Sequence, residues 1–225
     1  MQQLARPMQD LEDWLVVHPD DGPTKLLQSL QALPIDQTKV SGLLVQSLAE
    51  ADTAQSREAL GTILGAVGAF PPSTAIQAVV AAGDLGEKAP PPLKEALARL
   101  LDSPLTDGSY RMTDTALFSF ARMAREDAAA REHLLQRVTP WLEANAVPHQ
   151  TAQALSALAN AAVNEPGLVE RAAGFARSPE AEIRLAVVDY LGSLPETAPG
   201  RNMLDQFLTD PDPRIQQEAE RLSSR

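Results

Sequence analysis

The sequence contains no cysteine, which excludes disulfide bonds, thiol catalysis and thiolate metal sites. Aromatic residues make up only 4% of its 225 residues, so a hydrophobic core must be built mainly from Ala, Leu and Val. Small aliphatic side chains of this kind suit closely packed helices. Runs of Val, Ile, Tyr and Thr that alternate with polar residues are also missing, and with them the usual signal for β-strands.

Long apolar runs and positive charge are scarce as well. No stretch approaches the roughly 18 apolar residues that cross a membrane, so we expect a soluble protein without a membrane span. The 30 Asp and Glu residues outnumber the 19 Lys and Arg residues, which gives a formal net charge of -11. Such a charge repels phosphate backbones and predicts no nucleic-acid partner. The sequence leaves the cellular compartment open.

What the sequence does contain is helix-forming residues interrupted by Pro, Gly, Asp and Ser every 12 to 20 residues or so. About twelve or thirteen helices with short connections follow from this pattern, and short connections make successive helices antiparallel. Prolines near the first turn of several helices fit this division. In the second half we expect helices over 110–125, 128–145, 148–163, 166–177, 179–193, 197–209 and 211–223.

A helical unit recurs near the C-terminus with a period of roughly 32 residues, which is typical of solenoid arrays. One copy covers 178–195 and the next covers 210–224, so that Ile183 and Ile215 occupy equivalent positions. Both copies begin with a turn and continue as a helix.

These units resemble HEAT repeats, whose second helix typically begins with an Asp-Pro-like turn followed by an aliphatic residue, Arg and Ala. The first copy matches at Ile183, Arg184 and Ala186. In the second copy Gln216 replaces the Arg, so the hydrogen bonding that this Arg provides within an array is not assured there. Thr139-Pro140-Trp141 resembles the kinking Pro of a HEAT first helix. The resemblance implies an all-α fold, a right-handed α-α superhelix of about six stacked antiparallel helix pairs, and a single domain over 1–225, with divergent repeats in 1–90 and more regular ones in 91–225.

A second resemblance concerns residues 156–195, where the order of segments is similar to the superhelical region of vitellogenin-type lipid transport proteins. It implies a helical half-collar beside a lipid-carrying β-domain, and no such β-domain is present in the sequence. A helical domain related to these proteins is therefore an alternative interpretation.

No catalytic, cofactor or metal site is predicted, and we expect a protein that is not an enzyme. His18, His133 and His149 lack the spacing of a zinc helix, and no GxSxG or SxxK pattern occurs. A divergent HEAT-like enzyme, such as a DNA glycosylase or a cofactor lyase, is a second alternative, although a glycosylase of this fold depends on a basic concave face.

Three glycines spaced four and three residues apart, Gly61, Gly65 and Gly68, could suggest a phosphate-binding loop. No strand precedes them, however, and small residues at this spacing on a helix more often allow neighbouring helices to approach closely. We therefore expect close helix packing at these glycines.

The function that we predict is a protein-protein interaction or assembly scaffold that binds a partner protein or peptide along its concave face, lined by the second helices. An Arg cluster between 110 and 138 is typical of a solvated helix face with partners four residues away, and the alternative interpretation is a rim that contacts an acidic partner peptide. An uncapped last repeat would also favour a homodimer through the terminal repeats. The residues expected on or beside the binding face are Arg111, Arg122, Arg184, Val188, Asp189, Gln216, Gln217 and Glu220.

Overall fold

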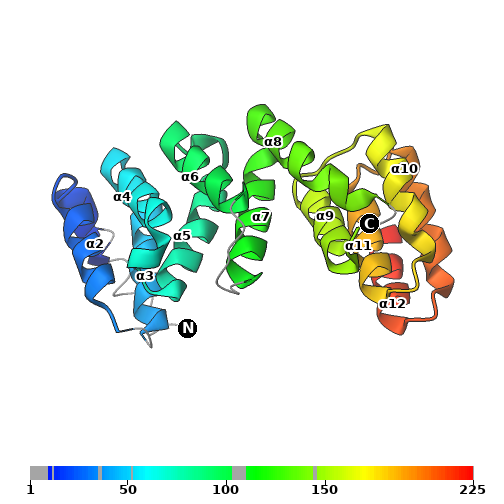
Figure 1. The fold of residues 1–225 in the computed structure, drawn as a ribbon, viewed down its shortest axis with the longest axis horizontal. Coiled ribbons are helices and arrows are strands. Elements are labelled where there is room, and N and C mark those ends of the chain that lie inside the picture. Colours follow the sequence, from blue (N-terminus) through cyan, green and yellow to red (C-terminus); the bar gives the residue numbers. More distant parts are fainter. Residues whose placement is uncertain are drawn as a thin grey trace. The chain divides into compact units, whose positions relative to one another are not determined.

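A computed structural model describes residues 10–11, 13–34, 37–51, 53–102, 110–143 and 146–224, except for the side chains of 38, 87 and 110–113. The described residues are almost entirely helical and contain no β-strand, which confirms the all-α prediction (Figure 1). The α-helices are α2 (Gly22–Ala32), α3 (Thr38–Glu50), α4 (Ala54–Gly65), α5 (Pro72–Asp84), α6 (Pro91–Asp102), α7 (Tyr110–Ala124), α8 (Ala128–Val138), α9 (Pro148–Asn160), α10 (Pro166–Gly174), α11 (Ala181–Ser193) and α12 (Pro213–Ser223).

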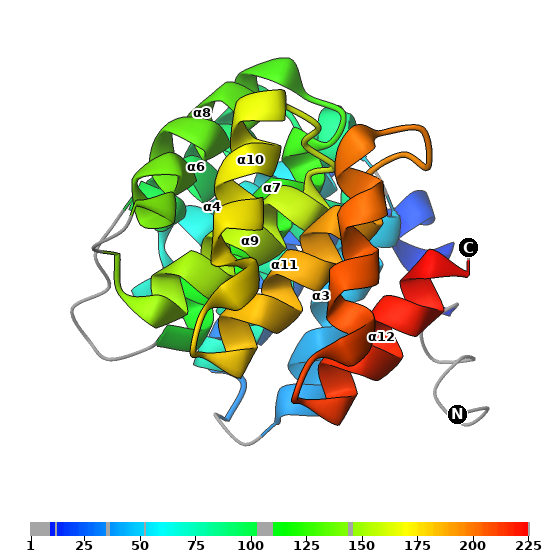
Figure 2. The ribbon, with the colours of Figure 1, turned by 90° about the vertical axis from the view of Figure 1, so that its right-hand side faces the viewer.

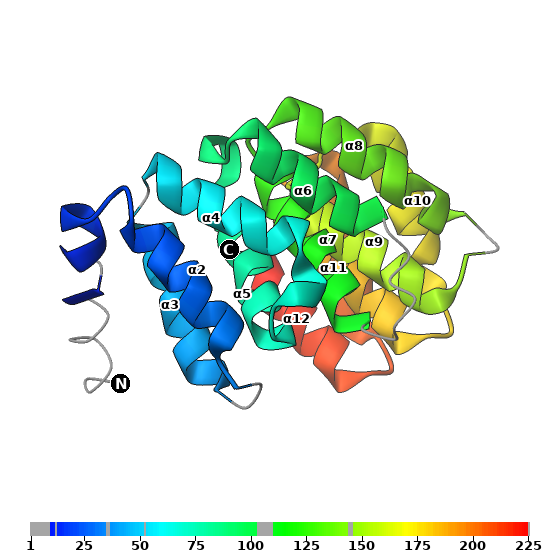
Figure 3. The ribbon, with the colours of Figure 1, turned by 60° about the vertical axis from the view of Figure 1, so that its left-hand side comes forward.

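The chain forms two compact units, Met1–Phe120 and Ala121–Arg225, with the boundary inside α7. In the first unit α2, α4 and α6 follow one another in one layer, and α3 packs against α5 in a second layer (Figure 3). Each helix of the second layer follows a helix of the first in sequence. The unit is therefore built from successive antiparallel helix pairs, as the short connections predict.

The second unit repeats this arrangement. Helix α9 packs against α11, and α11 packs against α12, while α10 contacts the 3-10 helix η5 (Pro199–Thr209) (Figure 2). Helix α11 is the central element, and both of its sides are covered. Its residues Ile183, Ala186, Val187, Tyr190 and Leu191 are all buried.

Local sequence signals explain where several helices begin. Thr53 precedes α4, and its side chain accepts a hydrogen bond from the backbone N–H of Ser56, whose hydroxyl in turn accepts one from the Thr53 N–H. This reciprocal pair satisfies two N–H groups that a helix leaves unpaired. Proline occupies the first or second position of α2, α5, α9, α10 and α12, where its missing N–H costs nothing.

Several predicted helices end earlier than the sequence suggests. Helix α8 stops at Val138, and Thr139–Leu142 form the 3-10 helix η3 because Pro140 cannot donate the next helical hydrogen bond. The predicted helix over 128–145 is therefore wrong for residues 139–143, and residues 144–145 lie outside the described residues. Residues 199–209 are likewise a 3-10 helix rather than the expected α-helix.

The glycines that allow close helix packing are not the predicted ones. A Cβ built on Gly61, Gly65 or Gly68 meets no atom within 4 Å, so these residues permit no close approach. A Cβ on Gly83 of α5, by contrast, would lie 2.7 Å from both the Cα and the backbone oxygen of Ser119 in α7. The missing side chain of Gly83 is what allows these two helices to touch.

Candidate interaction surfaces

The turn before α12 carries the main buried ion pair of the described residues. Nε and Nη2 of Arg184 donate to the two carboxylate oxygens of Asp210 at 2.8 and 3.0 Å, and Nη1 donates to the carbonyls of Ser178 and Pro179. The Arg184 and Asp210 side chains are 11% and 5% exposed. The guanidinium holds the pKa of Asp210 below its usual value, and the carboxylate raises the pKa of Arg184.

Two of the residues predicted on the binding face therefore lie in the interior. Arg184 ties α11 to the turn before the next helix, and Val188 on the same helix is fully buried. Neither side chain offers a surface to a partner. Spacing placed both residues on the second helix correctly, but it could not show that Arg184 finds a carboxylate 26 residues later.

In the last repeat Gln216 compensates in part for the missing Arg. Its Nε2 donates to the backbone carbonyl of Asp210, just as Nη1 of Arg184 donates to the carbonyl of Ser178. Ser178 and Asp210 are 32 residues apart, as are Arg184 and Gln216. The last repeat thus keeps the hydrogen bond to the preceding turn, although Gln216 cannot form the ion pair that Arg184 forms with the next repeat.

The other predicted residues of α11 and α12 are exposed. Asp189 on α11 lies near Glu218 and Arg221 of α12, and Gln217 and Glu220 are exposed on α12. Partial burial, followed by the negative charge of Glu218, raises the pKa of Asp189 to about 6. Nε of Arg221 donates to Glu218 at 2.8 Å, which places a cation beside the two carboxyls. The cluster is a charged surface in which two carboxyls share one guanidinium, so its charge is only partly neutralised within the chain.

The outer face of α12 is polar, since its apolar residues Ile215, Ala219 and Leu222 are all buried. The homodimer through the terminal repeats stays a prediction.

Two Arg side chains of the predicted cluster have contacts inside the second unit. Arg131 donates to the carbonyls of Ala124 and Arg125 at the end of α7, and the guanidinium of Arg137 lies 5.0 Å from the centre of the Trp141 ring. Arg122 is half-buried and has interactions of its own. The side chain of Arg111 lies outside the described residues.

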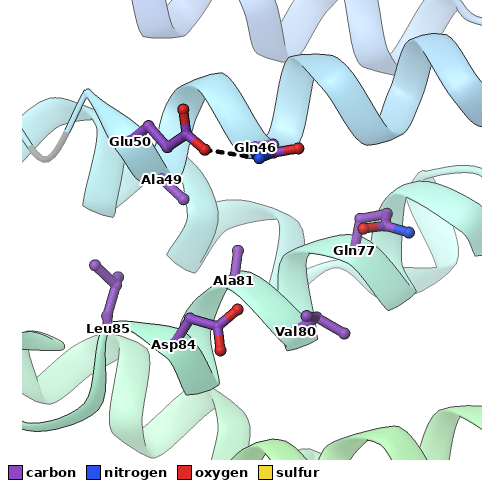
Figure 4. Close-up of a pocket in the computed structure, with 8 residues that line it drawn as sticks. All are labelled: Gln46, Ala49, Glu50, Gln77, Val80, Ala81, Asp84 and Leu85. Atoms are coloured by element: carbon purple, nitrogen blue, oxygen red, sulfur yellow. Dashed lines mark hydrogen bonds between the residues drawn. The ribbon is translucent and has the colours of Figure 1, made fainter. Parts of the chain in front are cut away.

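The first unit contains a groove that the sequence did not predict. It lies between α3 and α5 and encloses about 410 Å³ (Figure 4). The hydroxyl groups of Ser41 and Ser73, 3.2 Å apart, join the two helices near their N-terminal ends. The residues lining the groove are Gln46, Ala49, Glu50, Gln77, Val80, Ala81, Asp84 and Leu85.

Polar side chains rim this α3–α5 groove, and small apolar side chains line it between them. Gln46 donates to Glu50 at 2.7 Å along α3, and the exposed Gln77 side chain lies 3.9 Å from the position that a Cβ on Gly42 would occupy. Ala49 and Ala81 extend only a short way from their helices, which leaves the space open (Figure 4). The signal that could have located the groove is the 32-residue spacing of Ser41 and Ser73, which sets the register of the two helices.

Two other depressions lie in the opposite layer of the first unit. The one between α4 and α6 encloses about 470 Å³ and is lined by charges of both signs, Arg57, Arg99 and Glu58. The one between α2 and α4 is smaller, at about 230 Å³. The α3–α5 groove differs from the first of these in carrying charge of one sign only.

The described residues contain no group of three or more His, Asp or Glu side chains placed to hold a metal ion. None of the described helices is long and apolar enough to cross a membrane.

Comparison with known proteins adds little to this geometry. No protein-family model and no curated protein matches the sequence. Two engineered proteins solved by the Northeast Structural Genomics Consortium are similar in structure, each with 17% sequence identity. The first gives a TM-score of 0.49 over 92% of this chain and 58% of its own, so the chain spans less than two thirds of its length. The second gives a TM-score of 0.46 and covers 97% of this chain and 95% of its own. At these TM-scores neither resemblance bears on function.

Proposed function

We propose that the chain is a non-catalytic interaction or assembly scaffold of the HEAT-repeat type, which binds a partner protein or peptide along the layer of its second helices. The observation that carries the proposal is the α3–α5 groove, a concave site with a few polar groups around small apolar residues. Sites of this composition are typical of places where proteins bind a ligand or a short segment.

The two-layer construction supports the same function. Each helix pair is stabilised mainly by its neighbours, so side chains on the outer surface of a layer are free to vary with the partner. The Arg184–Asp210 pair and the Gln216 hydrogen bond serve the stacking, whereas Gln46 and Gln77 sit on the surface.

Site-specific photo-crosslinking tests this function. The full chain would carry p-benzoylphenylalanine in place of Gln77, which is exposed in the groove, or in place of Glu95, which is exposed on α6 in the opposite layer. Both variants would be irradiated in extract of the native host, with excess unmodified chain as competitor, and the products identified by mass spectrometry.

We expect a defined partner crosslinked from position 77, suppressed by the competitor and absent from position 95. Recovery of the same products from both positions, or of nothing beyond the chain itself from position 77, contradicts the proposal that partners bind along the second-helix layer.

A further inference from the structure

We propose that η5 is a two-state element, which two polar anchors hold as a 3-10 helix and which converts to a shorter α-helix when either anchor is released. The anchors are Arg201, near the start of η5, and Asp210, directly after its end. Helix η5 lies in the second unit and contains no residue of the α3–α5 groove.

The first observation is that η5 is unusually long for a 3-10 helix. It covers 11 residues, whereas helices of this type rarely exceed about four. The N–H of Arg201 donates to the carbonyl of Ala198 at 2.9 Å. At the other end the N–H of Asp210 donates to the carbonyl of Phe207 at 3.1 Å, so the hydrogen bond over three residues is present at both ends. These bonds have poorer geometry than those of an α-helix, so other contacts must favour the 3-10 form here.

The apolar residues of η5 fit either type of helix. Gly200, Leu204 and Phe207 are buried, and their spacing of four and three residues is typical of one face of an α-helix. Leu204 and Phe207 are also three residues apart, which places them on one side of a 3-10 helix. Apolar burial therefore does not choose between the two forms.

The polar contacts of the two anchors are both directed at α11. The two carboxylate oxygens of Asp210 accept from Arg184, which lies on α11. The half-buried guanidinium of Arg201 donates to three backbone carbonyls near the ends of α11 and α12, those of Gly192, Leu194 and Leu222. Each anchor therefore needs its own side chain on the side of η5 that faces α11.

Only the 3-10 form meets this condition for both anchors. The nine residues from Arg201 to Asp210 make three full turns of a 3-10 helix, so the two side chains leave it on the same side. The same residues would make about two and a half turns of an α-helix, which places the two side chains on opposite sides. An α-helical η5 can satisfy one anchor but not both.

Release of one anchor removes the condition and shortens the element. The rise falls from about 2.0 Å per residue in a 3-10 helix to about 1.5 Å in an α-helix, so η5 would shorten by about 5 Å. Because η5 connects α11 to α12 and packs against both, the change would move α12 along α11. A partner that binds the shorter form more tightly would shift the equilibrium toward it. Shifts of about one helical turn between packed elements are a known form of switching.

The test uses the full chain, two anchor variants and a control. Arg201→Ala removes the contacts with the helix ends. Arg184→Met with Asp210→Ala removes the ion pair and leaves no buried charge without a partner. The control is Asp205→Asn, which changes an exposed carboxyl of η5 that belongs to neither anchor.

Two measurements report on η5. Nuclear Overhauser contacts from Hα to the amide proton two residues later mark a 3-10 helix, and contacts to the amide proton four residues later mark an α-helix. The length would be measured by double electron–electron resonance between spin labels on Glu196→Cys and Thr209→Cys, both of which are exposed positions. The chain has no cysteine of its own, so only these two sites carry labels.

We expect the 3-10 contacts in the parent and the control, and the α-helical contacts in both anchor variants with a label distance about 5 Å shorter. If Arg201→Ala does not fold, the double variant gives the same readouts. Four-residue contacts throughout η5 in the parent, an unchanged pattern and distance in a folded anchor variant, or a switch in the control would overturn the proposal. Loss of all helical contacts over 199–209 in a variant that is otherwise folded would overturn it too, because the anchors would then hold the helix together rather than select its type.

Discussion

The substitution Asp210→Ala should destabilise the second unit more than the removal of an exposed carboxylate. It deletes the two carboxylate oxygens that accept from the Arg184 guanidinium, one of which also accepts from the backbone N–H of Asp212 at 2.8 Å. Arg184 keeps its hydrogen bonds to the Ser178 and Pro179 carbonyls but loses its counter-ion.

The magnitude follows from the burial of the pair. Removing one member of a buried ion pair typically costs about 3–5 kcal/mol, because the other charge is left unpaired. Arg184 keeps its two carbonyl acceptors and is 11% exposed, so we expect a cost at the lower end of this range, about 3 kcal/mol. Replacing both residues, by Arg184→Met with Asp210→Leu, should cost less than the single change because no buried charge remains.

The assay is urea unfolding followed by circular dichroism, with Asp205→Ala on η5 as an exposed control. Because the pKa of Asp210 is lowered in the folded state, its contribution is fully present above the unfolded pKa of about 3.9 and disappears as the pH falls through the folded value. The difference between Asp210→Ala and the parent should therefore shrink below pH 4. A cost below 1 kcal/mol at pH 7, equal to that of the control, would refute the assignment of a structural role to this pair.

Other changes have equally specific outcomes. Gly83→Ala should destabilise the first unit by about 1–3 kcal/mol in thermal melts, because its Cβ would overlap the backbone of Ser119, whereas Gly61→Ala should stabilise α4 by up to about 1 kcal/mol. The pKa of Asp189 is raised to about 6, so its charged form is unfavourable in the folded state. The substitution Asp189→Asn should therefore stabilise the protein at pH 8 but not at pH 4, by at most about 1 kcal/mol because the side chain is exposed. NMR titration of the carboxyl checks the midpoint. Tyr190→Phe should cost about 1 kcal/mol in urea unfolding, because it removes a buried hydrogen bond to a backbone carbonyl.

The helices of this protein could be read from its sequence because their signals are local. Pro, Gly and capping residues mark the ends, and Thr53 forms the cap that its position suggests. Thr139–Leu142 shows the limit of such signals. A proline after a helix can kink the helix or end it, and only the packing of the following segment decides between the two.

The exposure of the candidate binding residues was harder to predict because it depends on contacts between helices. A periodic pattern identifies the second helix of a repeat, but it does not show that Arg184 pairs with the buried Asp210 while Asp189 of the same helix is exposed. The glycines illustrate the same point. Gly61 and Gly83 both lie within helices, and only the position of Ser119 shows that Gly83 is the one that lets two helices touch.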